Sequence, residues 1–289
     1  MLKFGLIGDP VAHSLSPVMH ARFFDYYHID ASYRSIHLKT SELKIFLENI
    51  RNSDYLGINV TIPHKENVIP HLDALSNEAK KFGAVNTIHN KNGFLVGYNT
   101  DISGFKSSLP ISIVGENVIL LGAGGSARSI MAACISAGCR QISIFNRTLE
   151  KATKLCESFS RSNPYVIFKA FSLSDPELKH ELSNARLLVN ATSIGMKSNS
   201  DINLPVCRDD FHKGLFIYDI IYNPLETELI KIAHNEGIPC LNGLDMLIYQ
   251  GLESLRIWLN RELPFQKSLI KQTKTELTNK LVHIYNVVK

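Results

Sequence analysis

Hydrophobic and polar positions along the first hundred residues change repeatedly between a period of two and a period of about 3.6. In residues 58–66, INVTIPHKE, three aliphatic positions alternate with Asn59 and Thr61 as in a strand, and Pro63 ends the pattern because it lacks the N–H that a sheet needs. Strands are predicted at residues 3–8, 31–38, 58–62, 84–90 and 93–99, and helices at residues 17–29, 41–52 and 73–83. Strands that alternate with helices predict an α/β domain with a largely parallel sheet.

Two of these helices carry predictions about particular residues. In residues 17–29, the helical spacing places Met19, Phe23 and Tyr26 on one face. In residues 41–52, Ser41 is expected to cap the first turn, because its hydroxyl can accept a hydrogen bond from a free backbone N–H.

A second α/β unit is predicted from about residue 102. It begins with an apolar strand of the buried parallel kind, NVILLG, and a helix that ends at the C-cap Gly138. Further strands are predicted at residues 141–148, 185–196, 215–224 and 238–241, and helices at residues 227–237 and through Trp258. In the tail, Leu277, Leu281, Ile284 and Val288 form the apolar stripe of one more helix.

The glycine-rich sequence GAGGSA, residues 122–127, follows the apolar strand and opens the helix. It fits G-x-G-x-x-G/A with Ala127 in the last place, inside the strand–turn–helix context that dinucleotide binding requires. Gly122 permits a tight turn, and Gly124 lets a pyrophosphate approach the helix N-terminus, where free N–H groups attract phosphate. A glycine turn without a ligand is the alternative, and the context favours a nucleotide.

The end of the next strand favours NADP over NAD. An NAD site places a carboxylate there to accept from the ribose 2′-hydroxyl, whereas this chain has Asn146, Arg147 and Thr148, and no acid before Glu150. Arg147 can bind a 2′-phosphate through its planar guanidinium, and an acid would repel that phosphate. A solvated basic turn is the alternative interpretation.

Composition narrows the class of protein. The 289 residues are 45% hydrophobic, enough for a sizeable core, and the net charge of +4 is not gathered into the basic stripe of a nucleic-acid-binding protein. The five cysteines show no C-x-x-C spacing, so neither a disulfide framework nor a zinc site is expected, and a reducing cytosol fits. We expect no signal peptide, no membrane span and no metal.

The chain also contains long motifs in a characteristic order. These are HSLSPVMH, NVTIPHKE, GAVNTI, GYNTDISGF, GAGGSAR, NRT, NATSIGM, YNP and GLDMLIYQG, and they extend from residue 4 to about residue 260. In this the sequence closely resembles the shikimate dehydrogenase family. The family usually has Asn at the position of Ala21, and the tail beyond about residue 265 is longer than usual. This tail is expected to form one more packed helix, and a role in a dimer contact is left open.

The resemblance implies a fold and a division of the chain. It implies two α/β domains around a cleft, the second a Rossmann-type doubly wound parallel sheet. Residues 1–101 with 238–289 would form the substrate-binding and catalytic domain, and residues 102–237 the NADP-binding domain. It further implies a cytoplasmic enzyme, monomeric or homodimeric, that binds a small molecule and neither nucleic acid nor membrane.

The resemblance also assigns residues. It implies Lys65 and Asp101 as the catalytic pair, with shikimate or 3-dehydroshikimate as substrate and NADP as cofactor. Substrate contacts would come from Ser14, Ser16, Asn59, Thr61, Lys65, Asn86, Asp101, Tyr222 and Gln250. Cofactor contacts would come from Gly122, Gly124, Gly125, Ser126, Ala127, Arg128, Asn146, Arg147, Thr148, Thr192, Ser193, Gly243 and Met246.

The chemistry agrees with this assignment. Reduction of a ketone needs a hydride from the cofactor and a proton for the developing alkoxide, and a lysine ammonium can supply that proton. Taken singly, Lys65 is more consistent with a solvated lysine, Asp101 with a helix cap, and the two serines with a local turn, than with a catalytic or binding role. A buried Asn86 amide would need partners in any case.

Other functions stay open. A quinate/shikimate dehydrogenase that uses NAD would require only small changes around Ser14 and Thr61. A non-catalytic regulator that binds a nicotinamide nucleotide or a shikimate-like ligand is less consistent with the presence of both Lys65 and Asp101. A tRNA-linked reductase carries a similar glycine loop, but the basic residues here are not clustered.

Overall fold

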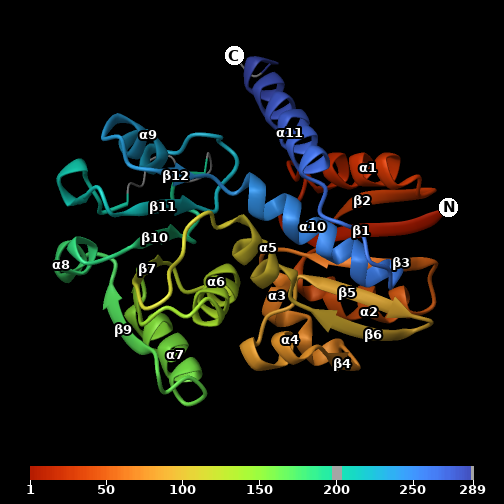
Figure 1. Cartoon of the computed structure of the whole chain (residues 1–289). Coiled ribbons are helices and arrows are strands. Elements are labelled where there is room, and N and C mark those ends of the chain that lie inside the picture. Colours follow the sequence, from red (N-terminus) through yellow and green to blue (C-terminus); the bar gives the residue numbers. More distant parts are fainter. Residues whose placement is uncertain (197–203, 288–289) are drawn as a thin grey trace. The chain divides into compact units, whose positions relative to one another are not determined.

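The computed structural model describes residues 1–196 and 204–287 (Figure 1). The chain divides into two compact units, of which unit 1 holds residues 1–108 and 245–280, and unit 2 holds residues 109–244 and the end of the chain from residue 281. No helix within the described ranges combines the length and the apolar composition that crossing a membrane would take.

Unit 1 contains, among its described residues, a six-stranded sheet in the order β2-β1-β3-β5-β6-β4. Its strands are β1 (Leu2–Gly8), β2 (Ala31–His37), β3 (Tyr55–Val60), β4 (Ala74–Leu75), β5 (Thr87–Lys91) and β6 (Phe94–Tyr98). Its helices are α1 (Ser16–Tyr27), α2 (Leu43–Arg51), α3 (His64–Asn67), α4 (Asn77–Phe82), α5 (Thr100–Ser108) and α10 (Leu244–Leu259), with the 3-10 turns η1 (Thr40–Glu42) and η2 (Ile69–His71).

The sheet of unit 1 is mixed, because β5 runs antiparallel to both β3 and β6. The expectation of a largely parallel sheet therefore missed the direction of one strand. The reversal is made by a two-residue hairpin turn at Asn92 and Gly93, whose φ angles are 54° and 91°. Asn-Gly is the pair that this turn type favours, since both residues need positive φ.

Helices cover both faces of this sheet. Leu43, Leu47 and Ile50 of α2 pack with Ile7 and Ile58 of the strands in one core cluster. On the other face, the buried Trp258 of α10 stacks on Phe4 at a ring distance of 4.8 Å and donates a hydrogen bond from Nε1 to the Ile88 carbonyl at 2.9 Å. Gly57 lies beneath this indole, where a Cβ would come within 2.2 Å of Nε1. A glycine is therefore required there for the helix to reach the sheet.

One of the two predictions about the helices of unit 1 was wrong. Met19, Phe23 and Tyr26 lie on α1 at the expected helical spacing; the first two are fully buried, and Tyr26, 36% exposed, packs edge-on against Tyr27 in the last turn. Ser41 does not cap α2, because it lies inside η1, and α2 begins only at Leu43 with no side-chain cap. The hydrogen bond at this corner comes instead from the Lys39 backbone N–H to the Glu42 carboxylate, at 2.8 Å.

Unit 2 contains, in its described part, a six-stranded parallel sheet in the order β12-β11-β10-β7-β8-β9. Its strands are β7 (Asn117–Leu121), β8 (Gln141–Asn146), β9 (Ile167–Ser172), β10 (Leu187–Asn190), β11 (Phe216–Asp219) and β12 (Cys240–Leu241). Its helices are α6 (Gly125–Ser136), α7 (Leu149–Ser160), α8 (Glu177–Ser183) and α9 (Glu228–Asn235), with the 3-10 turn η4 (Arg208–Asp210).

The strand order of unit 2 confirms the predicted Rossmann-type topology. Counted from β7, it reads 3-2-1-4-5-6, the doubly wound arrangement in which the order reverses between β7 and β10. Residues of α8 and α9 share one core cluster with the sheet, as Leu178, Leu182 and Leu229 illustrate. Strand β9 and helices α7 and α8 were not predicted from the sequence.

The tail forms α11 (Lys267–Val287), as the apolar stripe predicted. Leu277 and Leu281 are fully buried, while the predicted positions Ile284 and Val288 lie outside the described side chains. Within unit 1, Lys274 of α11 forms an ion pair of 2.6 Å with Asp245 at the start of α10.

Candidate active site

Lys65 and Asp101 form an ion pair in unit 1. Lys65 Nζ donates to Asp101 Oδ2 at 2.6 Å, and the two side chains are only 12% and 8% exposed. Lys65 lies on the short helix α3 after the turn that follows β3, and Asp101 lies in the first turn of α5. His64 anchors α3, because its buried ring bonds to the Leu38 carbonyl at 2.7 Å. The two predicted catalytic side chains, 36 residues apart in the chain, are thus held together.

Asn86 holds the other oxygen of Asp101. Its Nδ2 donates to Asp101 Oδ1 at 2.8 Å, to Thr100 Oγ1 at 2.9 Å and to Gln250 Oε1 at 3.3 Å. Its Oδ1 accepts from the Thr100 backbone N–H at 2.7 Å. The amide is 3% exposed, so the expectation that it needs partners is confirmed, although Asn86 lies just before β5 rather than inside it.

Asn59 lies behind these residues and is 6% exposed. Its Nδ2 donates to the Asn86 carbonyl, to Thr87 Oγ1 and to Ser254 Oγ at 3.0–3.1 Å, and its Oδ1 accepts from the Tyr33 hydroxyl at 2.8 Å. These bonds use both ends of the amide. The predicted contact of Asn59 with a substrate stays a prediction, and the visible role of Asn59 is to support Asn86.

Three members of this network were missed from sequence. They are Tyr33, Thr87 and Ser254. Ser254 Oγ contacts Thr87 Oγ1 at 2.8 Å and Thr100 Oγ1 at 3.1 Å, and it donates to the Gln250 carbonyl at 2.9 Å. A signal existed for Ser254, because residues four apart share one face of a helix and Gln250 had already been singled out.

A neutral aromatic layer lies beyond Asn59. The fully buried His20 stacks on Tyr33 with a ring distance of 4.2 Å and an interplanar angle of 10°. Burial lowers the pKa of His20 to about 3, so the ring is neutral near pH 7. No cation therefore competes with Lys65 for Asp101 from this side.

Ser14 and Thr61 lie in the connections that follow β1 and β3, which are adjacent parallel strands, and Ser16 is the first residue of α1. Ser14 Oγ donates to Ser16 Oγ at 3.1 Å and accepts from the Ser16 backbone N–H at 3.2 Å, which is the local turn bonding expected of serines. Thr61 follows the last residue of β3, and its backbone N–H donates to the Ile7 carbonyl at 2.9 Å. All three belong to one edge of the unit 1 sheet.

The glycine turn of unit 2 has the geometry that its sequence predicted. Gly122 has φ +108°, and a Cβ there would lie 3.0 Å from the Ala191 carbonyl oxygen. Gly124 is the N-cap of α6, and a Cβ there would meet no described atom within 4 Å. Ala127 is fully buried against the sheet. The first turn of α6, with Gly125, Ser126 and Arg128, thus begins at an open position beside a helix N-terminus, which suits a phosphate, and the Arg128 backbone N–H closes that turn by donating to the Gly124 carbonyl at 3.0 Å.

The end of β8 suits a second phosphate. Arg147 is exposed and forms no ion pair with any residue in the described ranges. Asn146 Nδ2 donates to the Thr148 carbonyl at 2.8 Å, which shapes the turn, and Thr148 is the N-cap of α7. A guanidinium beside a helix N-terminus is a favourable place for a 2′-phosphate. These residues fit NADP better than NAD.

The remaining predicted cofactor residues do not all belong to one unit. Thr192, Ser193 and Gly243 lie in unit 2, after β10 and before α10, whereas Met246 lies in α10 in unit 1. Tyr222, a predicted substrate contact, lies after β11 in unit 2. Gly243 must be a glycine, because a Cβ there would come within 1.9 Å of the Ile220 carbonyl oxygen.

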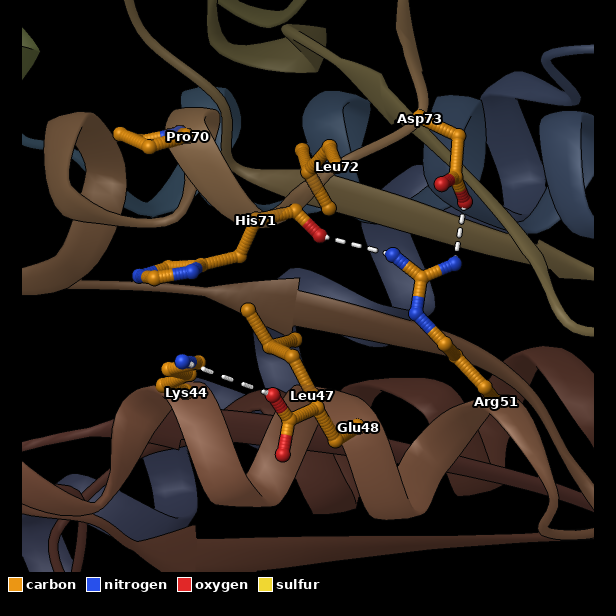
Figure 2. A pocket seen from close by; sticks show the side chains of 8 residues that line it. All are labelled: Lys44, Leu47, Glu48, Arg51, Pro70, His71, Leu72 and Asp73. Atoms are coloured by element: carbon orange, nitrogen blue, oxygen red, sulfur yellow. Dashed lines mark hydrogen bonds and ion pairs between the residues drawn. The ribbon is translucent and has the colours of Figure 1, made fainter.

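Two other features are separate from these residues. A pocket of about 260 Å³ in unit 1 is lined by Lys44, Glu48, Arg51, His71 and Asp73 among others, and none of the predicted site residues lines it (Figure 2). On α8, Glu177, His180 and Glu181 bring potential metal ligands within 4.8 Å of one another. The Glu181 carboxylate is already bound by Lys169 and Ser143 at 2.6 Å, so this cluster does not suggest a metal centre.

Comparison with known proteins identifies relatives over most of the chain. Residues 6–88 match the shikimate dehydrogenase substrate binding domain, residues 106–221 the shikimate / quinate 5-dehydrogenase model, and residues 243–267 the shikimate 5′-dehydrogenase C-terminal domain. A shikimate dehydrogenase (NADP(+)) of Streptococcus pneumoniae is 39% identical over 94% of this chain and 95% of its own.

Solved structures agree. The shikimate 5-dehydrogenase of Listeria monocytogenes in complex with shikimate and NAD superposes with a TM-score of 0.86 at 33% identity, covering 96% of each chain. The Thermus thermophilus enzyme in complex with NADP(H) and shikimate gives a TM-score of 0.83 at 34% identity, covering 96% of this chain and all of that one.

Proposed function

The chain belongs to the shikimate dehydrogenase family, and from this premise we propose that it catalyses the reversible NADP-dependent reduction of 3-dehydroshikimate to shikimate. It is an oxidoreductase acting on a CH–OH group, in the pathway to chorismate and the aromatic amino acids. One observation carries the catalytic assignment, namely the Lys65–Asp101 ion pair of 2.6 Å, in which Asn86 also binds the carboxylate.

We propose that Lys65 transfers the proton. NADPH, when bound, supplies the hydride. As negative charge grows on the carbonyl oxygen of the substrate, the Lys65 ammonium stabilises it and then donates a proton to it. Asp101 keeps the ammonium oriented, because its other oxygen is fixed by Asn86. In the reverse direction, Lys65 accepts the proton from the hydroxyl that is oxidised.

We propose that the substrate is oriented by the polar residues around this pair. Ser14 and Ser16 hold the carboxylate, and Thr61, Asn86 and Gln250 hold ring hydroxyls. The support is that the amides of Asn86 and Gln250 are already ordered beside Asp101, so little conformational entropy is lost on binding. Tyr222 is proposed as a further contact, and Asn59 as a residue that supports Asn86.

The cofactor residues follow from unit 2. We propose that the turn at Gly122, Gly124 and Gly125 holds the pyrophosphate and that Arg147 holds the 2′-phosphate, with Asn146, Thr148 and Arg128 beside it. The open position at Gly124 and the exposed guanidinium of Arg147 support this. The proposed domains, residues 1–101 with 238–289 for substrate and 102–237 for NADP, are supported by the division of the chain near residues 108 and 244.

The test is turnover of shikimate with NADP, followed by the absorbance of the reduced nicotinamide. Wild-type protein is expected to be active, and Lys65→Ala is expected to lose roughly 100-fold or more in kcat. Substrate and cofactor binding are checked by titration. The exposed Lys80→Ala is the matched control, since Lys80 lies on a different short helix and outside the site. An inactive wild type would refute the function, and an active Lys65→Ala would refute the role of Lys65.

The alternative substrate and cofactor are tested in the same assay. Quinate is offered beside shikimate, and NAD beside NADP. Arg147→Ala is expected to raise KM for NADP by roughly tenfold and to leave KM for NAD nearly unchanged, because only NADP carries the 2′-phosphate. Equal effects on both cofactors would contradict the proposed role of Arg147.

A further inference from the structure

Asp219 is a buried carboxylate at the end of β11, and the catalytic scheme makes no use of it. It is fully buried, and it lies directly opposite Asn190, the last residue of β10, in the parallel pairing of the two strands. Burial raises the pKa of Asp219 to about 6, against the opposing effect of its hydrogen bonds. Burying a carboxylate that pairs with no cation among the described residues costs free energy of folding, so its hydrogen bonds are expected to serve a purpose.

Three neutral donors bind this carboxylate. Oδ1 accepts from Asn190 Nδ2 at 3.0 Å and from the Ile221 backbone N–H at 3.0 Å, and Oδ2 accepts from Thr227 Oγ1 at 2.6 Å. The donors come from the end of β10, from the connection after β11 and from the N-cap of α9. A carboxylate accepts at both oxygens, whereas an asparagine there has one acceptor oxygen and a donor NH₂ group, so the hydrogen bond at the other position must be reversed or lost.

Asn190 connects Asp219 to the loop after β10 through its side-chain hydrogen bonds. Its Oδ1 accepts from the Thr192 hydroxyl at 2.7 Å and from the Thr192 backbone N–H at 3.1 Å. Its Nδ2 also donates to the Ile194 carbonyl at 3.1 Å, and Thr192 Oγ1 accepts from the Ile194 backbone N–H at 3.0 Å. The conformation of the loop that bears Thr192 therefore depends on the Asn190 amide, which in turn is bound to the Asp219 carboxylate.

This loop lies against the glycine turn. A Cβ at Gly122 would come within 3.0 Å of the Ala191 carbonyl oxygen and 3.2 Å of Thr192 Cγ2. The contact occurs between the ends of β7 and β10, where the strand order of the sheet reverses and where α/β sheets bind their ligands. On its other side, the Ile221 connection receives a hydrogen bond from the Gly243 backbone N–H at 3.1 Å.

We propose that Asp219 is a positioning residue for cofactor binding: its carboxylate joins the loops after β10 and β11 and so fixes the surface that receives the nicotinamide half of the cofactor. This inference rests on the proposed function, in which Thr192, Ser193 and Gly243 contact that half. The adenosine half is held elsewhere, at Arg147 on the end of β8. Loss of the Asp219 carboxylate should therefore weaken one half of the cofactor site and spare the other.

The experiment compares two probes on Asp219→Asn. NADPH reports on the whole site, and adenosine 2′,5′-bisphosphate reports only on the adenosine half, because it carries the 2′-phosphate but no nicotinamide. Calorimetric titration of the full chain is expected to show NADPH affinity reduced about tenfold and bisphosphate affinity within about twofold of wild type.

Glu181→Gln is the matched control in the same unit. Glu181 is also a buried carboxylate, 5% exposed, and it accepts from Gln141, Ser143 and Lys169 at 2.6–2.7 Å. Glu181 lies on α8, and its partner Gln141 begins β8, whereas Asp219 ends β11, so the Glu181 carboxylate is bound at the other end of the parallel strands. The control variant is expected to bind both probes with affinities within about twofold of wild type.

The outcomes separate the inference from the function it rests on. If Asp219→Asn leaves NADPH affinity unchanged, or weakens both probes equally, the positioning role is refuted while the proposed function stands. A wild-type protein that binds neither probe refutes the proposed cofactor and this inference with it. Should Asp219→Asn fail to fold, Thr227→Val replaces it, because this substitution removes one of the three donors. The ratio of NADPH affinity to bisphosphate affinity is then compared with that of the wild type. Thr227→Ser, which keeps the hydroxyl, is expected to restore NADPH binding.

Discussion

Asp101→Asn is the sharpest test of how the candidate active site is held together. In the wild type, Asp101 Oδ2 accepts from Lys65 at 2.6 Å and Oδ1 accepts from Asn86 at 2.8 Å. An asparagine has one oxygen and one NH₂ group, so one of these two donors would face another donor whichever way the amide turned. The substitution is nearly isosteric, so it changes charge and hydrogen bonding without opening a cavity.

The magnitude follows from burial. Removing one partner of a buried ion pair costs about 3–5 kcal/mol, because the remaining charge loses its counter-charge in a medium of low polarity. Both side chains here retain a little exposure, 12% for Lys65 and 8% for Asp101, so the lower end applies. We expect Asp101→Asn to lower the free energy of unfolding of unit 1 by about 3 kcal/mol.

The assay uses the single tryptophan of the chain. Trp258 is buried in unit 1, stacked on Phe4, so its fluorescence reports the unfolding of that unit in urea. The comparison includes Lys65→Met and the double variant. If the pair is coupled, the double variant should be more stable than the sum of the two single losses predicts, by about 1–2 kcal/mol.

Two results would refute this reasoning. An unchanged urea midpoint in Asp101→Asn would mean that the ion pair does not hold this part of unit 1 together. Additive losses in the double variant would mean that Lys65 and Asp101 contribute independently despite the 2.6 Å contact. A loss of activity without either change in stability would leave the pair with a purely chemical role.

Two further predictions concern the fold of unit 1. Gly57→Ala places a Cβ 2.2 Å from Trp258 Nε1 and should cost about 3 kcal/mol in urea unfolding, whereas Gly251→Ala, whose Cβ meets the flexible end of a methionine, should cost less; equal losses would contradict the reasoning. Arg51→Ala should cost about 1–2 kcal/mol near neutral pH, because Arg51 binds Asp73 and the His71 carbonyl (Figure 2) and also the Gly93 carbonyl. The hydrogen bond from Arg51 lowers the pKa of Asp73, so this difference should be full at neutral pH and shrink as the pH falls below the ordinary value of 3.8. A difference that grew on acidification would refute that assignment.

Much of the fold could be predicted because its signals are local. The apolar strand before residue 122 and the glycine turn after it identified the nucleotide-binding unit, and the strand order confirmed the topology. The direction of β5 was missed although its signal was also local, since Asn92 and Gly93 form the dipeptide of a two-residue hairpin turn.

The candidate site could be predicted only in part. Lys65 and Asp101 came from the resemblance to a family, because no periodicity connects residues 36 positions apart. Asn59 and Thr61 share one face under a period of two, but β3 ends at Val60, so Thr61 lies in the following turn and the rule does not extend to it. The internal bonding of Asn59 depends on Ser254, which is 195 residues away, and no local pattern contains that information.

Because β5 is antiparallel to β6, the short turn between them sets the register of the two strands and so the position of Asn86. Residues of β5 and β6 pair from Lys91 and Phe94 beside the turn to Thr87 and Tyr98 at the far end, and the chain enters β5 from Asn86. Four residues of strand, about 14 Å, separate the turn from that end. One residue inserted into the turn would slip this alignment and send alternate side chains to the opposite face. A surface turn of a kind that ordinarily tolerates changes in length thus fixes where Asn86 lies relative to Asp101, whose carboxylate it binds.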